Sequence, residues 1–160
     1  MADSEPTPVA LALGRIPTGL YIVSTLDGDL PVGFVGSFLM QVGMAPPVVS
    51  VAVGKGRGPL AALRANGRFG VSILDGASQG TMGNFFAKPA PGKTPFDGLQ
   101  VGRGRGGSPV LLDALAWLEC RVTGEHELAD HVVVFGEVED GSLQRTGDPA
   151  IHLRKNGLGY

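Results

Sequence analysis

The chain has 160 residues, of which 43% are hydrophobic and 18% are charged, and its formal net charge is −2. This length suits one domain with a packed core better than two, and the small negative charge gives no electrostatic reason to bind nucleic acid or an anionic membrane. A soluble domain usually has about 25% charged residues. Because this chain has fewer charges to cover its surface, we expect it to bury part of that surface against a second copy, as a homodimer.

Cysteine content and the opening residues indicate a cellular compartment. The single cysteine, Cys120, excludes a disulfide framework and a cysteine-based metal site and fits a reducing cytoplasm. The opening MADSEPTP has neither the basic nor the apolar region of a secretory signal, and no apolar stretch is long enough to span a bilayer. We therefore expect a cytoplasmic protein, with a flexible tail over residues 1–8 and a single domain over residues 9–160.

The first half of the chain alternates short apolar runs with turn residues. Val9, Leu13 and Ile16 recur at helical spacing and predict a short helix before Pro17. Aromatic and β-branched residues then predict strands, while a proline and a later Asn-Gly pair mark the two ends of a second helix. The strands are expected over residues 19–26, 32–38, 48–53 and 69–74, with a turn at 27–29 and the second helix over 60–65.

The second half contains longer loops. Residues 115–122 alternate in hydrophobicity, with Cys120 on the apolar side, and predict a strand. The other elements are a short helix over residues 77–86, loops over 88–98 and 102–107, a strand over 131–139 after a connection at 124–130, and short closing strands at 142–144 and 151–153.

These elements define the expected fold class. Many short strands at close spacing, with only a few short helices, predict a mainly β protein built as a β-barrel. Strands and long helices do not alternate regularly, which argues against a doubly wound parallel sheet. The sequence has no internal repeat and no domain boundary.

Four segments carry a resemblance to a known family. They are residues 13–25 (LGRIPTGLYIVST), 33–53, 118–136 and 152–160 (HLRKNGLGY). In this order they resemble the flavin reductase-like family of FMN-binding split β-barrels. The resemblance implies a Greek-key-like split barrel with a few short helices, and a homodimer with one flavin per subunit near the interface. It also implies an NAD(P)H:flavin oxidoreductase, in which hydride passes from NADH or NADPH to FMN, and on to free flavin, a partner oxygenase or another acceptor.

The run over residues 33–47 suits the ring of such a flavin. A flavin needs a flat, mostly apolar slot and hydrogen-bonding groups along its polar edge. Gly33 and Gly36 have no Cβ and let the backbone approach a planar ligand, while Ser37 and Gln41 offer hydrogen bonds. We therefore expect Gly33, Gly36, Ser37, Phe38 and Gln41 to bind the cofactor. The alternative is a strand and bulge with ordinary loop polar groups.

The glycine-rich run over residues 54–58 suits a phosphate. Lys55 and Arg57 follow a predicted strand and precede a helix start, where free backbone N–H groups and the helix dipole favour an anion. The alternative is a solvated basic loop. From the resemblance we add Ser78 and Gln79, which follow the fourth strand, to the cofactor site. Phe85, Phe86 and Phe96 would cover the ring or pack in the core, and of these we add Phe85 to the site. The sequence does not decide between FMN and FAD, or between NADH and NADPH.

His131 is the candidate for positioning a reacting ring. It follows Asp130 at a predicted strand start, and the resemblance places a histidine there near the flavin or nicotinamide. A surface turn histidine is the alternative. The three histidines are scattered without clustered acidic partners, so no metal site is expected. Cys120, in the middle of an apolar strand, is expected to be a buried core thiol rather than a nucleophile.

Residues 102–107 (GRGRGG) match the spacing of the dinucleotide-binding glycine fingerprint. That motif has meaning only between a strand and a helix, and the next periodic segment here alternates like a strand, so we interpret the run as a flexible loop. Arg103 and Arg105 leave two further interpretations open. They would gate the nicotinamide cofactor, or they would belong to a nucleic-acid-binding barrel, against which the acidic net charge and the 6% aromatic content argue.

A non-enzymatic flavoprotein is the main alternative function. In flavin enzymes the cofactors carry out the hydride chemistry, and the protein stacks and orients the two rings. The sequence therefore needs no catalytic triad or carboxylate pair, and it fits an FMN-binding electron carrier as well as a reductase.

Overall fold

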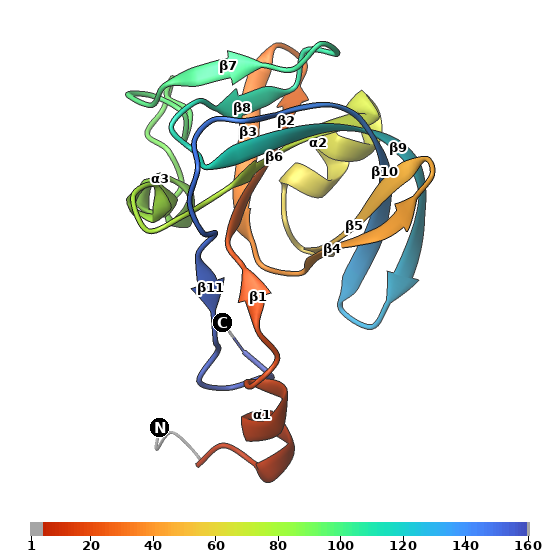
Figure 1. Cartoon of the computed structure of the whole chain (residues 1–160), viewed down its shortest axis with the longest axis vertical. Helices are drawn as coiled ribbons and strands as arrows, with labels where there is room; N and C mark the ends of the chain where they lie inside the picture. Colours follow the sequence, from red (N-terminus) through yellow and green to blue (C-terminus); the bar gives the residue numbers. More distant parts are fainter. Residues whose placement is uncertain (1–4, 160) are drawn as a thin grey trace.

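Seven antiparallel strands form one sheet, in the order β3-β2-β6-β9-β10-β5-β4, in the computed structural model, which describes residues 5–159 (Figure 1). Its strands are β2 (Tyr21–Asp27), β3 (Leu30–Gly36), β4 (Leu39–Met44), β5 (Pro47–Gly54), β6 (Arg68–Ile73), β9 (Ala116–Leu128) and β10 (His131–Leu143). Two smaller pairs are β1 (Thr18–Gly19) with β11 (Ile151–His152), and β7 (Val101–Arg103) with β8 (Pro109–Leu111). The helices are α1 (Pro8–Leu13), α2 (Pro59–Asn66), the 3-10 helix η1 (Gln79–Met82) and α3 (Gly83–Phe86).

The large sheet curls around one apolar core. Phe34 on the edge strand β3, Val51 on β5 and Val134 on β10 belong to the same cluster of contacting buried side chains. Side chains from opposite halves of a sheet this wide meet only if the sheet bends toward a barrel. Within the described chain, β3 and β4 follow each other in sequence but do not pair through hydrogen bonds, so the barrel is split between them. The structure confirms the expected mainly β split barrel.

Local sequence sets the ends of α2. Pro59 occupies its first turn, where a missing N–H is tolerated. Gly67 ends the helix with a φ of 70°, in the left-handed region that favours glycine. Leu60 and Leu63 from this helix pack into the barrel core. The predicted helix over residues 60–65 is confirmed and is slightly longer than expected.

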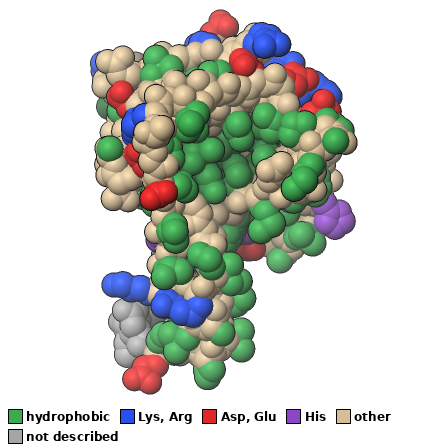
Figure 2. All heavy atoms as spheres, in the orientation of Figure 1, with side chains coloured by type: hydrophobic (Ala, Val, Ile, Leu, Met, Phe, Trp, Pro, Cys, Tyr) green, Lys and Arg blue, Asp and Glu red, His purple; other side chains and the backbone are tan. Residues whose placement is uncertain are grey.

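The two ends of the described chain form an arm that extends from the barrel (Figure 1). Thr18 on β1 pairs with His152 on β11, and the N–H of Gly157 donates to the carbonyl oxygen of Ala10 in α1 at 2.8 Å. Figure 2 shows hydrophobic side chains gathered on this arm. Val9, for example, is 64% exposed. The arm therefore carries apolar surface that residues 5–159 leave uncovered.

Several predicted boundaries are wrong. β4 was not expected as a separate strand: the predicted strand over 32–38 breaks at Ser37, and a new strand begins at Leu39. The expected connection over 124–130 belongs mostly to β9, and only Ala129 and Asp130 separate β9 from β10. Ala129 has a φ of 47°, which allows this tight turn. The expected closing strand over 142–144 is the end of β10.

The boundary between the predicted tail and the first helix differs from expectation, and so does the end of that helix. Residues 1–4 lie outside the described chain, and Pro8 is already the first residue of α1. The Thr7 hydroxyl caps this helix by accepting from the N–H of Ala10 at 3.2 Å. α1 ends at Leu13, three residues before the expected Ile16. No helix within residues 5–159 is long and apolar enough to cross a membrane.

Candidate functional site

A cavity of about 650 Å³ lies beside Ser37, at the corner between β3 and β4. Its walls come from four parts of the chain: the residue before β2 with the end of β3 and the residue after it, the loop before α2, the η1–α3 segment, and β11 with the residues after it. The lining residues are Leu20, Val35, Ser37, Arg57, Met82, Phe86, His152, Leu153, Arg154, Lys155, Asn156 and Gly159.

The cavity combines apolar walls with positive charge. Val35, Met82 and Phe86 provide apolar surface for a flat ring. The charged lining residues are Arg57, Arg154 and Lys155. No carboxylate is present among the lining residues of the described chain, so the net charge of this wall is positive. Such a cavity suits a ligand with a flat apolar ring and a negatively charged group, such as a phosphate.

Two buried polar atoms in the cavity wall lack a partner. Within residues 5–159, the Ser37 Oγ and the Arg154 Nε accept or donate no hydrogen bond. Ser37 is only 7% exposed, so solvent cannot readily satisfy its hydroxyl. A buried polar atom without a partner costs free energy, and a ligand that pairs with the Ser37 hydroxyl removes that cost. The buried, unpaired Ser37 hydroxyl therefore fits a site that holds a cofactor.

The predicted residues Phe38 and His131 do not line this cavity, but Phe38 contacts Arg154, which does. The ring centroids of Phe38 and His131 are 5.7 Å apart in an edge-on arrangement, and the guanidinium carbon of Arg154 lies 4.6 Å from the Phe38 centroid. The His131 Nδ1 and the Asp130 Oδ1 are 2.8 Å apart. This hydrogen bond is the main cause that lowers the pKa of Asp130, and it fixes the orientation of the imidazole ring.

Gly33 and Phe85 contact each other rather than the cavity. A Cβ on Gly33 would lie 3.2 Å from the Phe85 ring and 3.1 Å from the Phe96 ring. The Phe85 and Phe96 rings themselves meet edge-on with centroids 5.1 Å apart. The missing side chain of Gly33 therefore lets the α3 segment pack on β3. A Cβ on Gly36 would contact Val23 at 3.2 Å, on the side of the barrel core.

The remaining predicted residues make other contacts. The Gln41 amide donates to the carbonyl oxygen of Gly43 at 3.0 Å, and the Lys55 ammonium pairs with Glu127 at 3.2 Å. The Ser78 hydroxyl donates to Asp75 at 2.7 Å, and Gln79 is an exposed residue at the start of η1. Of the eleven predicted site residues, the structure places two, Ser37 and Arg57, in the cavity wall.

Sequence reasoning missed most of the wall. Of the neighbouring phenylalanines that could cover the ring, Phe86 rather than the selected Phe85 lines the cavity, and Phe86 is 73% exposed. Arg154 and Lys155 were noted only as part of the closing segment that carries the family resemblance. Two adjacent cations in a segment shared with a cofactor-binding family are a signal that could have included them. Met82 had no comparable signal, because it sits in a short, irregular helical segment.

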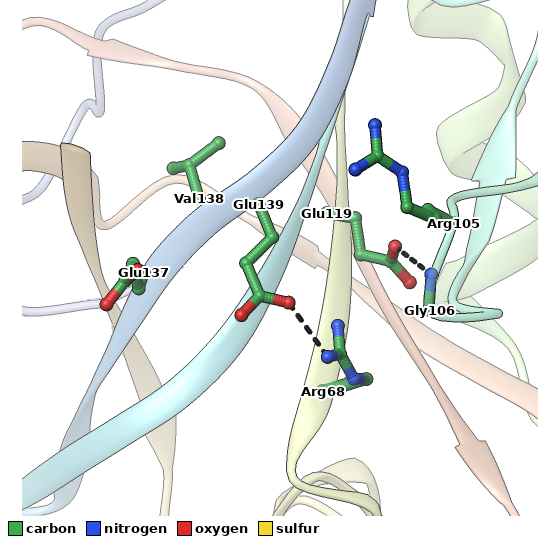
Figure 3. A pocket seen from close by; sticks show the side chains of 7 residues that line it. All are labelled: Arg68, Arg105, Gly106, Glu119, Glu137, Val138 and Glu139. Atoms are coloured by element: carbon green, nitrogen blue, oxygen red, sulfur yellow. Dashed lines mark hydrogen bonds and ion pairs between the residues drawn. The ribbon is translucent and has the colours of Figure 1, made fainter. Parts of the chain in front are cut away.

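A second hollow, of about 390 Å³, lies under the tip of the β7–β8 hairpin (Figure 3). Glu119 is completely buried there, and its carboxylate accepts hydrogen bonds from the N–H groups of Gly106 and Ser108. Arg68 pairs with Glu139 at 2.8 Å. Figure 3 shows both pairs side by side. The charged groups that line this hollow largely bond to one another or to backbone, so it is part of the scaffold.

This hairpin corrects the prediction of a flexible loop over residues 102–107. Gly102 and Arg103 belong to β7, and the following glycines form a hydrogen-bonded turn in which Gly107 has a φ of 93°. A Cβ on Gly104 or Gly106 would collide with Glu119 or Arg68, so the glycines serve close packing. The hairpin shares no residue with the cavity wall, which removes support from the interpretation as a gate for the nicotinamide.

Two further expectations concern Cys120, as a core thiol rather than a nucleophile, and the histidines, which were not expected to form a metal site. Cys120 is fully buried in the barrel core, which confirms the expected core thiol, and burial raises its pKa to about 12. Within residues 5–159, no three His, Cys, Asp or Glu side chains are grouped so that they could hold a metal ion.

The fold and the cavity together describe a split-barrel protein whose site suits a flat, negatively charged cofactor. The chain belongs to the flavin reductase-like family, whose "Flavin reductase like domain" matches residues 13–157. The family expected from the four sequence segments is thereby confirmed.

Curated relatives are longer proteins. The chain is 36% identical over 151 residues to Diflavin flavoprotein A 1 of Synechocystis sp., an alignment that covers 93% of this chain and 26% of that protein. The chain thus spans about a quarter of the length of the curated relatives that it matches.

Solved structures with the same fold include a monooxygenase component and an oxidoreductase. One is the nitrilotriacetate monooxygenase component B homologue from Mycobacterium thermoresistibile, with a TM-score of 0.83 and 31% identity, covering 91% of this chain and 80% of that one. Another is the NADH:FAD oxidoreductase of Streptomyces globisporus, with a TM-score of 0.82 and 28% identity, covering 91% and 87%. The latter has also been solved with NAD and FAD fragments.

Proposed function

We propose that the cavity beside Ser37 holds FMN and that the chain is an NAD(P)H-dependent flavin reductase. The observation that carries this proposal is the cavity wall itself, in which apolar side chains, three cations and a buried, unpaired hydroxyl converge in a member of this family. These are the features that a flavin with its phosphate requires. When bound, the flavin supplies the hydride chemistry between the nicotinamide and the final acceptor.

Each wall of the cavity has a separate role in this proposal. Ser37 pairs with the polar edge of the ring, which satisfies its buried hydroxyl. Met82 and Phe86 cover one side of the ring and exclude water. Arg57 and Arg154, with Lys155 beside them, hold the phosphate, because charge-assisted hydrogen bonds to phosphate are strong. Among the other predicted cofactor residues, Phe38 acts through its contact with Arg154.

His131 positions the nicotinamide or the flavin in this proposal. Its ring is held by the hydrogen bond to Asp130 and by the edge of Phe38, and Phe38 in turn contacts the Arg154 that lines the cavity. His131 is not itself a lining residue. Its role is therefore to set where the second ring stacks, and its loss should raise the KM for the nicotinamide more than it lowers flavin affinity.

FAD is the alternative cofactor, because the Streptomyces relative is an NADH:FAD oxidoreductase. The proposed acceptor is free flavin, a partner oxygenase or another protein. A partner oxygenase is supported by the Mycobacterium relative, which is a homologue of a monooxygenase component.

The proposed homodimer is supported by the apolar arm, where Val9 and Ile16 are 64% and 53% exposed. Light scattering on the purified protein measures its mass and tests the dimer.

The flavin proposal is tested by titrating the purified, flavin-free protein with FMN and with FAD. We expect quenching of flavin fluorescence, a perturbed visible absorbance band and a stoichiometry of one flavin per chain. Oxidation of NADH and NADPH is then followed with free flavin as acceptor. A protein that stays colourless and leaves flavin fluorescence unchanged at all concentrations does not hold the cofactor, and the proposal fails.

A non-enzymatic flavoprotein is the second candidate. It is favoured by the curated relatives, which are diflavin flavoproteins in which this segment is about a quarter of the chain, so that the segment would exchange electrons with other modules. A protein that binds FMN but does not oxidise NADH or NADPH, while it accepts electrons from a chemical reductant, would support the carrier over the reductase.

A further inference from the structure

We propose that Arg145 and Asp75 form a strut that positions two walls of the cofactor cavity, although neither residue lines it. The inference rests on the proposed flavin function, because it assigns a positioning role toward that site. It is carried by the hydrogen bonds around Asp75, from which both walls leave the barrel. Arg145 and Asp75 are therefore positioning residues rather than catalytic residues.

The strut is a two-pronged ion pair between the end of β6 and the segment after β10. The Arg145 Nε donates to the Asp75 Oδ2 at 2.9 Å, and its Nη2 donates to the Oδ1 at 2.7 Å. Asp75 is only 8% exposed, so this pair is partly shielded from water. The remaining guanidinium nitrogen, Nη1, donates to the carbonyl oxygen of Asp113 at 2.8 Å. One arginine thus ties three separate segments together, in a geometry that a planar guanidinium allows and an ammonium does not.

The first wall starts directly at Asp75. The N–H of Ser78 donates to the Asp75 Oδ1 at 2.9 Å, and the Ser78 hydroxyl donates to the same oxygen at 2.7 Å. The N–H of Gln79, the first residue of η1, donates to the Asp75 carbonyl oxygen at 2.9 Å. This turn sets the direction of the η1–α3 segment, which brings Met82 and Phe86 to the cavity.

The second wall starts beside the backbone of the same residue. After Arg145 the chain returns to the barrel, where Pro149 forms a β-bridge with Asp75. The N–H of Ala150 then donates to the carbonyl oxygen of Leu74 at 2.9 Å. The next residues are β11 and the segment His152, Leu153, Arg154, Lys155 and Asn156, which lines the cavity.

The strut therefore joins the apolar cover and the cationic wall at their common origin. If it is removed, both walls keep their chemical groups but lose the point that fixes their separation. Flavin affinity should fall, because binding must then also order the two segments. Turnover at saturating flavin should change little, because the groups that touch the cofactor are intact.

The test uses Arg145→Gln, which removes the charge and both guanidinium hydrogen bonds to Asp75, and Asp75→Asn. Arg64→Gln is the matched control, because Arg64 makes the same two-pronged pair with Glu125, at 3.0 and 2.7 Å, away from the cavity. Arg145→Lys keeps the charge without the fork and guards against a variant that fails to fold. FMN affinity, kcat at saturating FMN, and amide hydrogen exchange of the flavin-free protein are measured for each.

We expect FMN affinity to fall about tenfold in Arg145→Gln and in Asp75→Asn, with an intermediate loss in Arg145→Lys. The double variant should lose little more than either single one, because the two residues act as a unit. Amide exchange should rise over residues 79–86 and 150–156 in the flavin-free variants and stay unchanged there in Arg64→Gln.

Two results distinguish the possible failures. If exchange over these two segments and FMN affinity in the Arg145 variants match those of Arg64→Gln, the strut has no positioning role and the inference is overturned. If the unaltered protein does not bind FMN at all, the proposed function fails. The exchange data in the flavin-free protein still decide whether Arg145 orders both walls.

Discussion

The Arg154 guanidinium lies over the ring of Phe38, with its central carbon 4.6 Å from the ring centroid. This contact joins a cation from the closing segment to an aromatic residue at the corner between β3 and β4, and cations are attracted to the face of an aromatic ring. Phe38 also meets His131 edge-on at 5.7 Å. The cationic wall of the cavity and the histidine proposed to position the second ring are therefore connected through one side chain.

Arg154→Met is expected to weaken FMN binding about tenfold, because the apolar stem remains while the positive charge is lost. The affinity of the variant should also depend less on salt than that of the unaltered protein. Fluorescence titrations at low and high ionic strength measure both effects. Arg103→Met, on the hairpin away from the cavity, is the control. Equal affinities in the two variants would contradict a phosphate-binding role for Arg154.

Ser37→Ala separates binding from stability. Because the Ser37 hydroxyl has no partner within residues 5–159, its removal should leave the free energy of unfolding unchanged or raise it by about 1 kcal/mol. FMN affinity should fall, because the proposed ligand contact is lost. Ser24→Ala is the matched control, since the buried Ser24 hydroxyl donates to Pro109. It should lower stability by about 1 kcal/mol and leave FMN affinity unaffected. Urea unfolding and flavin titration of both variants make the comparison.

Glu119→Ala should destabilise the barrel without affecting the cofactor site. The Glu119 carboxylate accepts from Ser108 at 2.7 Å and from Gly106, and its removal leaves two N–H groups without their acceptor. Each buried unpaired group costs about 1–3 kcal/mol, so we expect a loss of about 2–5 kcal/mol in urea unfolding. Glu119→Gln, which keeps one acceptor oxygen, should lose less. A fully stable alanine variant would show that the hairpin tip does not need this anchor.

The lowered pKa of the Asp75 carboxyl predicts that the free energy of unfolding depends on pH. The hydrogen bonds from Arg145 and then from Ser78 hold the pKa of Asp75 well below its usual range. A carboxyl whose pKa is lower in the folded state stabilises the fold above its unfolded pKa of about 3.9, and this contribution is lost as the pH falls toward the folded pKa. The stability difference between the unaltered protein and Asp75→Asn should therefore be constant from neutral pH down to about pH 5 and shrink below about pH 4. A difference that grows toward low pH would contradict this assignment.

Cys120 should be unreactive in the folded protein. Burial raises the pKa of its thiol to about 12, and only the thiolate is an effective nucleophile. We expect no labelling by a thiol reagent under native conditions at neutral pH, and one label per chain after unfolding, since the sequence has one cysteine. Rapid native labelling would show that the barrel opens easily around β9.

The strands that face the barrel core were predictable because their apolar periodicity follows the burial. β4 was missed for a physical reason. Its apolar residues Met40, Val42 and Met44 point outward and are 68%, 52% and 87% exposed, so the alternation of apolar residues along this strand does not follow burial in the core. The alternation over residues 115–122 does not predict that Glu119, a charged residue next to Cys120, is completely buried. The hairpin that covers it is a tertiary contact that the period of one strand cannot reveal.

The candidate site was predicted only in part, because it is assembled over long distances. Ser37 and Arg57 came from local glycine-rich patterns and line the cavity. Gly33 and Phe85 came from the same reasoning, but their shape serves the packing of α3 on β3. Arg154 and Lys155 reach the cavity only because β11 pairs with β1, a pairing between two strands of two residues each. Elements that short carry little periodic signal.

Through the arm, the first residues of the described chain hold the cavity-lining closing segment in place, although they do not line the cavity themselves. α1 is tied to Gly157, the Arg15 side chain donates to the carbonyl oxygen of Arg154 at 3.0 Å, and β1 pairs with β11. A protease cut between α1 and β1, or a fusion that pulls α1 off the closing segment, would therefore leave the cationic wall held by the β1–β11 pairing alone, while the barrel stays folded. Flavin retention would then report on whether α1 remains docked, more than a hundred residues away in sequence from the cations that it holds in place.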